Sequence, residues 1–469
     1  MATSAVQVPP RDPFHSKCFH EAIDEFRAKL IKKTATCPTS KLHDSIKKFQ
    51  ILIETEPGLK ELANNMFQEV PPTPTYDFDP GGKYRRLEDY KQMLQCLNSV
   101  LREAPAWDDD AHKAGLIGVP FNAILNWPLA TKSGRQFFLN DKVNERLKEI
   151  LDVHGRYLQS QVSREALPTW FAPEPLKILT EKASPYWPDG KMKTFDQIYS
   201  TDPDDKKYKG FKTWDEFFVR TFRPRIRPVQ YPDKDHGASD ESKKVITNAC
   251  ESVVYRCATN VDRNAPFWLK GQPYSLENML AGNYVDEFVR GTVYQAWLAA
   301  ECYHRWHCPV SGTIKKVINV PGTYFSGLEY YGFPEVYGNP NIPDPSGPNL
   351  SQRYITAVAT RALIFIEADN PDIGLMCFIA IGMDEISSCR VSVVEGQLVM
   401  KGQELGMFHL GGSSHCLVFR PQVELEWTRD AQPPFDDEKF DQHPIIPVNK
   451  WLAYAHRATR LVDGSVQSK

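Results

Sequence analysis

The sequence predicts an α+β protein in which helices precede a β-rich domain. Two patterns support this fold class: apolar residues recur at helical spacing before about residue 170, and short β-branched runs separated by glycine follow residue 245. A chain of 469 residues is also long enough to form two domains. We therefore expect an N-terminal helical extension over residues 1–170, a connecting segment over residues 171–244 and a β-rich domain over residues 245–469.

Two amphipathic stripes predict helices in the N-terminal extension. The first stripe consists of Leu42, Ile46, Phe49 and Ile53. The second covers residues 143–158 and has charged residues on its other face. In the connecting segment, residues 213–220 give a compact helical signal, which Pro224 and Pro228 end.

The C-terminal part contains strand-like runs at residues 317–320, 363–366 and 391–394. These runs favour a β-rich domain because β-branched side chains fit a pleated, half-buried surface. Glycines at residues 396 and 402 predict turns at residues 395–396 and 401–402.

A long segment over residues 326–350 is dense in proline, glycine, asparagine and aromatic residues. Such a segment is either a tolerated surface insertion or a lid over a binding site, and the sequence leaves both interpretations open. Several aromatic side chains would be costly to leave in water. If the segment faces a substrate, the candidate binding residues are Tyr330, Tyr331 and Phe333.

Composition and charge disfavour several classes of protein. The formal net charge is −3 with acidic and basic residues interspersed, so we expect no nucleic-acid partner. No apolar run is long enough to span a membrane, and the N-terminus lacks the apolar core of a signal peptide, so we expect a soluble cytoplasmic protein. Ten cysteines occur without a Cys-x-x-Cys pair, which indicates reduced, mostly buried thiols.

The stretch Gly411-Gly412-Ser413-Ser414 is a candidate self-cleavage site. Glycines before a serine allow backbone conformations in which the serine hydroxyl can attack the preceding carbonyl carbon. Attack on the Gly412 carbonyl would give an ester, and elimination would leave dehydroalanine, which hydrolyses to a pyruvoyl group. The simpler alternative is a flexible turn, which such a sequence forms more often.

Reactive side chains are densest in Cys302-Tyr303-His304-Arg305-Trp306-His307-Cys308-Pro309. Histidine and cysteine are the usual zinc ligands, but neither a helix nor a regular strand would bring Cys302, His304 and His307 to one point. No second pair at ligand spacing occurs in the domain, so we expect no metal. Acid–base chemistry is favoured instead, because imidazole accepts and returns protons near neutral pH.

Glu251 is the candidate carboxylate to orient such a histidine. It lies in an otherwise apolar, β-prone stretch, where an unpaired charge would be costly. Alone it is a weak signal, because a single glutamate at the end of a strand is usually solvated.

Five motifs occur in a characteristic order between about residues 208 and 419. They are Thr213-Trp214-Asp215-Glu216-Phe217-Phe218-Val219-Arg220 with Arg227-Pro228, Lys270-Gly271-Gln272-Pro273-Tyr274-Ser275-Leu276, Tyr303-His304-Arg305-Trp306-His307-Cys308-Pro309, Pro321-Gly322-Thr323 and Gly412-Ser413-Ser414. In this order they resemble the phosphatidylserine decarboxylase family of pyruvoyl enzymes, in which the last motif is Gly-Ser-Thr or Gly-Ser-Ser. The resemblance implies a pyruvoyl decarboxylase catalytic domain over residues 245–469 that cleaves itself between Gly412 and Ser413.

The resemblance also implies roles for individual residues. Ser413 would become the pyruvoyl group, His307 would be the base that activates it, and His304 would donate a proton during decarboxylation. Glu251 stands where the family has an aspartate, and its extra methylene changes its reach toward His307. His415, just after the cleavage site, would either contact substrate or fill space. The pyruvoyl group would act without pyridoxal phosphate or a metal, and the α and β chains from one precursor would stay associated.

Within this family the chain resembles a fungal branch that includes soluble aromatic L-amino acid decarboxylases, tryptophan decarboxylases among them. The likeness includes Ala249-Cys250-Glu251-Ser252 and the N-terminal helical extension. It implies a carboxy-lyase acting on a free aromatic amino acid, with tryptophan as first choice and tyrosine or phenylalanine next. The alternatives are decarboxylation of phosphatidylserine to phosphatidylethanolamine, and a scaffold that keeps the fold without cleaving itself.

Overall fold

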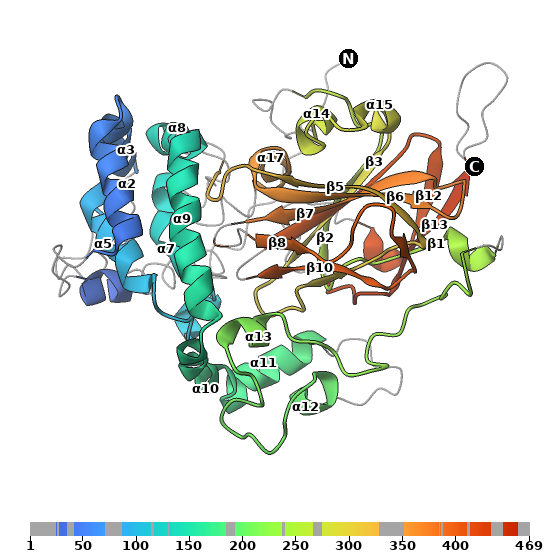
Figure 1. Ribbon diagram of the computed structural model, residues 1–469, viewed down its shortest axis with the longest axis horizontal. Helices are drawn as coiled ribbons and strands as arrows, with labels where there is room; N and C mark the ends of the chain where they lie inside the picture. The colour runs from blue at the N-terminus through green and yellow to red at the C-terminus, as the bar shows by residue number, and fades with distance from the viewer. Residues whose placement is uncertain are drawn as a thin grey trace, which may run out of the picture. The chain divides into compact units, whose positions relative to one another are not determined.

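The computed structural model describes residue 25 and residues 28–34, 42–70, 87–113, 117–129, 131–183, 193–236, 240–265, 274–327, 351–383, 385, 388–409, 413–432 and 444–457. The chain divides into two compact units, one of Met1–Val153 with Phe325–Ser351 and the other of His154–Tyr324 with Gln352–Lys469. Helix α9 (Asp141–Leu158) contains the boundary between them. Figure 1 shows the elements of both units.

The described residues of the first unit are mainly helical. Apart from helical residues 28–34 and the first part of α9, the helices are α2 (Asp44–Thr55), α3 (Leu59–Gln68), α5 (Tyr90–Val100), α6 (Asp109–Lys113), α7 (Pro120–Leu129) and α8 (Lys132–Leu139). Ile46, Phe49 and Ile53 of α2 are buried, which confirms the first predicted stripe. Phe49 meets Phe137 of α8 with ring centroids 6.0 Å apart. Burial of the apolar stripe therefore stabilises the helix that carries it.

Short helices precede and interrupt the strands of the second unit. They are the 3-10 helix η2 (Gln161–Ala166), α10 (Leu167–Trp170), α11 (Pro173–Ala183), α12 (Phe195–Ile198), α13 (Trp214–Phe218), the 3-10 helix η3 (Glu241–Lys244), α14 (Leu276–Met279), α15 (Val285–Phe288), α17 (Gln352–Val358) and the 3-10 helix η5 (Arg429–Ala431). Helix α13 confirms the predicted helical signal. Thr213 caps it, because its hydroxyl accepts a hydrogen bond of 3.0 Å from the Glu216 amide.

In the described residues, the strands of the second unit form three antiparallel sheets. The largest has the order β2 (Val253–Ala258), β3 (Thr292–Leu298), β11 (Ser413–Phe419), β7 (Leu375–Gly382), β6 (Arg361–Ala368), β5 (Gly312–Val320) and β9 (Leu398–Val399). The second has the order β4 (Arg305–His307), β10 (Glu404–His409) and β8 (Ser388–Val391). The third has the order β1 (Val245–Thr247), β13 (Trp451–Arg457) and β12 (Val423–Trp427). Helices followed by a β-rich part confirm the α+β fold class.

Two of the three predicted strand runs are confirmed, in β5 and β6, and the third is wrong in part. The run at residues 391–394 extends past β8, which ends at Val391. The Ser392 amide still donates to the Leu405 carbonyl at 2.8 Å, but the Val394 side chain is exposed. Gly396, with φ of 81°, then forms the predicted turn.

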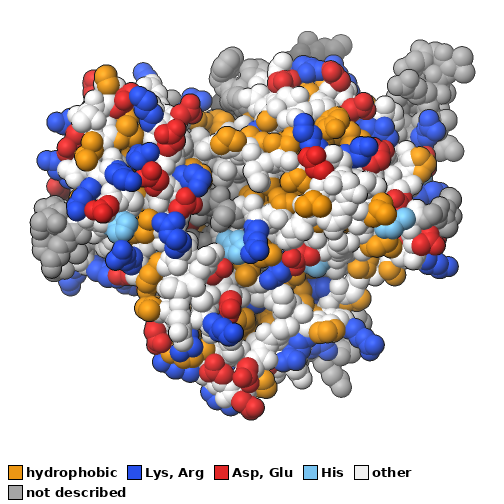
Figure 2. Space-filling view, viewed as in Figure 1, with side chains coloured by type: hydrophobic (Ala, Val, Ile, Leu, Met, Phe, Trp, Pro, Cys, Tyr) orange, Lys and Arg blue, Asp and Glu red, His pale blue; other side chains and the backbone are white. Residues whose placement is uncertain are grey.

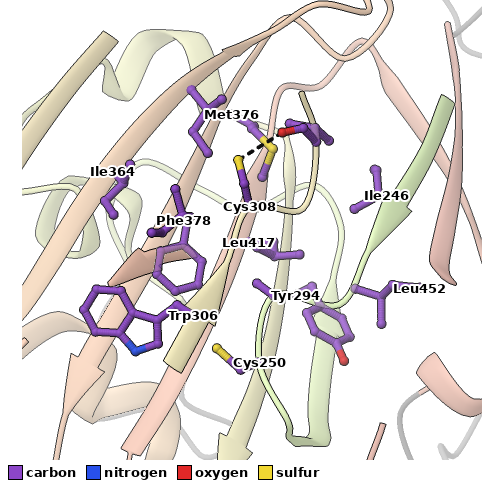
Figure 3. Close-up of a cluster of buried hydrophobic side chains, with 14 of the residues drawn as sticks. Ile246, Cys250, Tyr294, Trp306, Cys308, Ile364, Met376, Phe378, Leu417 and Leu452 are labelled. Carbon is purple, nitrogen blue, oxygen red and sulfur yellow. Dashed lines mark hydrogen bonds between the residues drawn. The ribbon is translucent and has the colours of Figure 1, made fainter. Parts of the chain in front are cut away.

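One apolar core joins the largest sheet to the sheet of β4, β10 and β8 (Figure 3). The indole ring of Trp306 on β4 lies 5.5 Å from the ring of Phe378 on β7 and 4.8 Å from that of Phe408 on β10, between centroids. Leu417 of β11 belongs to the same cluster. Cys308 donates a hydrogen bond to the Val310 carbonyl, and burial raises the pKa of its thiol to about 12. The strand that Ser413 begins is therefore packed into the centre of the second unit.

Acidic and basic side chains are intermixed over the face of the molecule drawn in Figure 2, with apolar side chains scattered among them. Within the part of the chain that the structure describes, no helix is both long and apolar enough to cross a bilayer.

A buried ion pair fixes the polar segment that leads into the first strand. The Lys401 ammonium lies 2.9 Å from the Asp233 carboxylate, and both side chains are almost fully buried. Lys401 also donates to the carbonyls of Tyr231 and Ser242, at 2.9 and 2.6 Å. Ser311 donates to the second Asp233 oxygen at 2.7 Å. The charges are thus compensated by several hydrogen bonds, which a buried pair requires.

Replacing Lys401 by methionine should destabilise the protein strongly, because it leaves the Asp233 carboxylate buried without its counter-charge. We expect a loss of about 3–5 kcal/mol in the free energy of unfolding, measured by urea denaturation. The matched control is Lys450→Met, which removes the more accessible Lys450–Asp430 pair and should cost no more than about 1 kcal/mol. Equal losses in the two variants would contradict the structural role of the buried pair.

Candidate active site

Ser413 is the first residue of β11, an interior strand of the largest sheet. Its backbone pairs with Leu298 of β3 on one side and with Gly382 of β7 on the other. The side chain is 1% exposed, and its Oγ has no hydrogen-bond partner among the described residues. Gly412, the other predicted cleavage-site residue, lies outside the described residues. An unpartnered buried hydroxyl is costly, so its retention at this position favours a functional role for Ser413.

The imidazole of His304 is fully buried and has one open nitrogen. Its Nε2–H donates to the Ala300 carbonyl at 3.2 Å, and its ring stacks on Phe218 of α13 with centroids 4.0 Å apart. Its Nδ1 is buried and has no partner among the described residues. Because burial penalises the charged form, the pKa of His304 is lowered to about 3. At neutral pH His304 is therefore an uncharged base with a free lone pair.

The sheet register places His304 at the end of the sheet where β11 begins. Leu298, opposite Ser413, is the last residue of β3, and the Ala300 carbonyl that holds His304 follows shortly after it. On β10, the amide of Phe408 donates to the His304 carbonyl at 3.0 Å. His304 and Ser413 thus belong to one region of the second unit.

His307 has both ring nitrogens occupied. Its Nδ1–H donates to the Gly402 carbonyl at 2.8 Å, which leaves Nε2 to accept the Tyr303 hydroxyl at 3.0 Å. Burial lowers the pKa of His307, so its resting ring is neutral. In the β4–β10 pair His307 lies opposite Glu404, the first residue of β10. The last residue of β10, His409, is the one closer in sequence to Ser413. Of the two histidines, His304 is nearer to Ser413 along this pairing.

Glu251 is buried, and its charge is compensated by Arg227 rather than by a histidine. The Arg227 Nε lies 3.2 and 3.1 Å from the two carboxylate oxygens, and its Nη2 donates to the same carboxylate. The Val448 amide donates to Glu251 at 2.8 Å. Glu251 therefore accepts from these groups instead of from His307, the partner that was expected, while His307 uses Tyr303 and Gly402. Glu251 remains close to this histidine, because the His307 amide donates to the Ala249 carbonyl at 2.8 Å.

His415 is a further buried, neutral histidine, two residues after Ser413 on the same face of β11. Its ring centroid lies 6.2 Å from that of Tyr294 and 5.9 Å from that of Phe378. Neither ring nitrogen has a partner among the described residues, and burial lowers the pKa of His415 to about 3. The structure thus shows His415 inside the apolar core. The predicted binding residues Tyr330, Tyr331 and Phe333 lie outside the described residues.

Three residues around the site were not assigned a role from the sequence: Arg227, Tyr303 and Phe218. Arg227 holds Glu251, Tyr303 occupies the His307 lone pair, and Phe218 covers the ring of His304. All three lie within the motifs that carry the family resemblance, and those motifs were the available signal. For metals, the described residues contain no cluster of three or more histidine, cysteine or acidic side chains that could hold an ion.

Comparisons with known proteins identify relatives for most of the chain. Two family models described as phosphatidylserine decarboxylase match residues 43–179 and residues 214–433. Decarboxylase iboD of Amanita muscaria is 39% identical over 73% of this chain and 92% of its own length. An L-tryptophan decarboxylase of Psilocybe cubensis is 33% identical over 82% of both chains. Phosphatidylserine decarboxylase proenzyme 3 of Schizosaccharomyces pombe is 28% identical over 46% of this chain and 19% of its own.

His415→Phe should make the unfolding free energy less sensitive to acid. A histidine with a folded pKa near 3 and an unfolded pKa near 6.5 binds its proton only in the unfolded state between these values, so stability falls as pH drops below about 6.5. Removing one such group should reduce the slope by up to about 1.4 kcal/mol per pH unit between pH 6 and 4. Urea denaturation at several pH values measures this slope of the unfolding free energy against pH. The control His456→Phe removes a half-exposed histidine and should change this slope less. A slope that stays unchanged in His415→Phe would contradict the burial of a neutral ring.

Proposed function

The chain belongs to the phosphatidylserine decarboxylase family, and from this premise we propose that it decarboxylates a free aromatic L-amino acid after cleaving itself between Gly412 and Ser413. The protein is a decarboxylase, that is, a carboxy-lyase. Tryptophan is the first candidate substrate, and tyrosine and phenylalanine are the next. The observation that carries the cleavage proposal is the buried Ser413 hydroxyl, which has no partner among the described residues.

The substrate proposal rests on the extent of the similarities. The L-tryptophan decarboxylase relative and decarboxylase iboD are similar over 82% and 73% of this chain. The Schizosaccharomyces pombe phosphatidylserine decarboxylase is similar over less than half of it. Phosphatidylserine is the alternative substrate, because the matching family models carry that name.

Ser413 fits the formation of a pyruvoyl group, the prosthetic group that enzymes of this family use. Its Oγ would attack the Gly412 carbonyl carbon, and the peptide C–N bond would break to give an ester and a free Ser413 amine. Loss of the Ser413 Cα proton and of Gly412 as a carboxylate would leave dehydroalanine. Addition of water and release of ammonia would then leave a ketone at the start of β11. The chemistry the ketone supplies is electron withdrawal from the substrate Cα as carbon dioxide leaves.

His307 is the proposed base for this maturation, with help from the charged pair nearby. Its ring is neutral at rest, and it can take the Ser413 proton once its bond to the Tyr303 hydroxyl opens. Burial is the largest influence on the pKa of His307 and lowers it; the hydrogen bond to the Gly402 carbonyl and, more weakly, the carboxylates of Glu404 and Glu251 act in the opposite direction and favour the protonated ring. Arg227 in turn offsets the cost of burying Glu251.

His304 is the proposed proton carrier in decarboxylation. Because its pKa is about 3, it is uncharged at neutral pH and must accept a proton before it can donate one. The substrate ammonium group must lose a proton to react, and the open Nδ1 can accept it. The same nitrogen can then return the proton to Cα after carbon dioxide has left. Phe218, stacked on this ring, covers one of its faces.

A substrate panel tests the proposed function. The wild-type protein should release carbon dioxide from L-tryptophan with a kcat/KM at least about tenfold above that for phosphatidylserine vesicles, with L-tyrosine and L-phenylalanine assayed in parallel. Ser413→Ala should stay a single chain on a denaturing gel and release no carbon dioxide, because alanine has no hydroxyl to attack the Gly412 carbonyl. Turnover of phosphatidylserine alone would support the alternative substrate, and turnover by Ser413→Ala would contradict the pyruvoyl proposal.

The two histidines should separate maturation from decarboxylation. His307→Ala should remain largely uncleaved, whereas His304→Ala should mature and lose about 100-fold or more in kcat, since general acid–base catalysis contributes that much. Gel analysis gives the cleaved fraction, and carbon dioxide release by the cleaved protein gives the rate. If His304→Ala failed to mature while His307→Ala cleaved normally, the assignments would be exchanged, as the open nitrogen of His304 would permit.

A further inference from the structure

The residue after Ser413 is held by its side chain as well as by its backbone. Ser414 is fully buried and points to the opposite face of β11 from Ser413. Its Oγ donates to the Ala296 carbonyl at 3.1 Å and accepts from the Gln295 Nε2 at 2.9 Å. Both of these residues belong to β3, the strand paired with β11. The Ser414 hydroxyl thus fastens β11 to its neighbour at the point where β11 begins.

Gln295 is itself held by Tyr274 and Gln352. The Tyr274 hydroxyl donates to Gln295 Oε1 at 2.7 Å, and Gln295 Nε2 donates to the Gln352 carbonyl at 3.2 Å as well as to Ser414. On α17, the Gln352 amide nitrogen lies 3.3 Å from the Met383 sulfur. The Gln295 side chain is fully buried, and its amide oxygen and nitrogen are both satisfied. Because a buried amide that loses a partner is costly, this arrangement fixes one orientation of Gln295.

Tyr274 can serve this network only as a donor. Burial raises its pKa far above the usual range, so its hydroxyl keeps its proton. Tyr274 is the tyrosine of the Lys-Gly-x-x-Tyr-Ser-Leu motif, for which the reaction chemistry gives no role. Tyr274 is linked to Ser414, next to the cleavage site, by two hydrogen bonds that share the Gln295 side chain. All three side chains are buried.

A reactive group at the end of a strand needs such a restraint. If the chain is cleaved before Ser413, residue 413 becomes a chain end, and chain ends fray unless they are tied down. The ketone would then be attached through the amide of Ser414. Fixing Ser414 limits the movement of residue 413, and small misplacements of a reacting group reduce rates strongly.

We propose that Gln295, oriented by Tyr274, is a positioning residue that fixes Ser414 and thereby places residue 413 for reaction. The proposal rests on the proposed function, because it concerns the same reactive residue. Gln295 does not touch the reacting atoms; it acts through Ser414. The hydroxyl at residue 414 is therefore required for efficient reaction, whereas its exact side chain is not.

Tyr274→Phe and Ser414→Ala test the proposal, with Tyr294→Phe as the matched control. Tyr294 precedes Gln295 in β3 and is also fully buried, but its hydroxyl has no partner among the described residues. Tyr274→Phe and Ser414→Ala should each lower the maturation rate or kcat about tenfold with KM changed less than threefold. Tyr294→Phe and Ser414→Thr, which keeps the hydroxyl, should stay within threefold of wild type. Turnover is measured on whichever of L-tryptophan and phosphatidylserine vesicles the wild type decarboxylates.

The double variant Tyr274→Phe/Ser414→Ala separates a shared effect from two independent ones. If both residues act through Gln295, the double variant should be no slower than the slower single variant, whereas independent effects would multiply to about 100-fold. The positioning role would be wrong if Tyr274→Phe reacted as fast as Tyr294→Phe, or if the losses multiplied in the double variant. In either case a wild-type protein that is cleaved and active would leave the proposed function standing. A wild-type chain that stayed whole would overturn both.

Discussion

The pairing of β11 between β3 and β7 is the constraint on which the rest of the site depends. Ser413 begins a strand that is hydrogen-bonded on both sides and buried along its whole length. The position of a serine in such a strand is fixed, so the side chains that react with it must be supplied by other elements. The continuation of β3 brings His304, and Trp306 packs the β4 strand against the same sheet. The scaffold therefore positions the chemistry, and rigidity at Ser413 is its main contribution.

Burial also determines which groups near Ser413 are charged. His304 and His307 are kept neutral by the cost of burying a positive charge, which makes them bases and not acids at rest. The buried negative charge of Glu251 survives because Arg227 and the Val448 amide surround it. A neutral base beside a compensated carboxylate suits reactions in which a proton is taken up first and returned later.

The sequence was sufficient for the fold class, for the α2 and α9 stripes and for the motifs that contain Ser413 and the two histidines, because these depend on local periodicity and spacing. Hydrogen-bond partners were harder to predict from the sequence. Glu251 is paired with Arg227 and not with His307, since that choice depends on how the connecting segment folds back onto the β-rich part. The strand predicted at residues 391–394 extends beyond the end of β8 at Val391, because β-branched composition does not reveal where pairing with the neighbouring strand ends. The role of Tyr274 became visible only through the side chains it reaches.

The most direct test of the central claim, that residue 413 becomes a ketone at the start of β11, is the intact mass of the purified protein before and after treatment with phenylhydrazine. We expect two chains split after Gly412, with only the C-terminal chain gaining one hydrazone. A single unmodified chain, or a C-terminal chain that begins with an ordinary serine and takes up no phenylhydrazine, would contradict it.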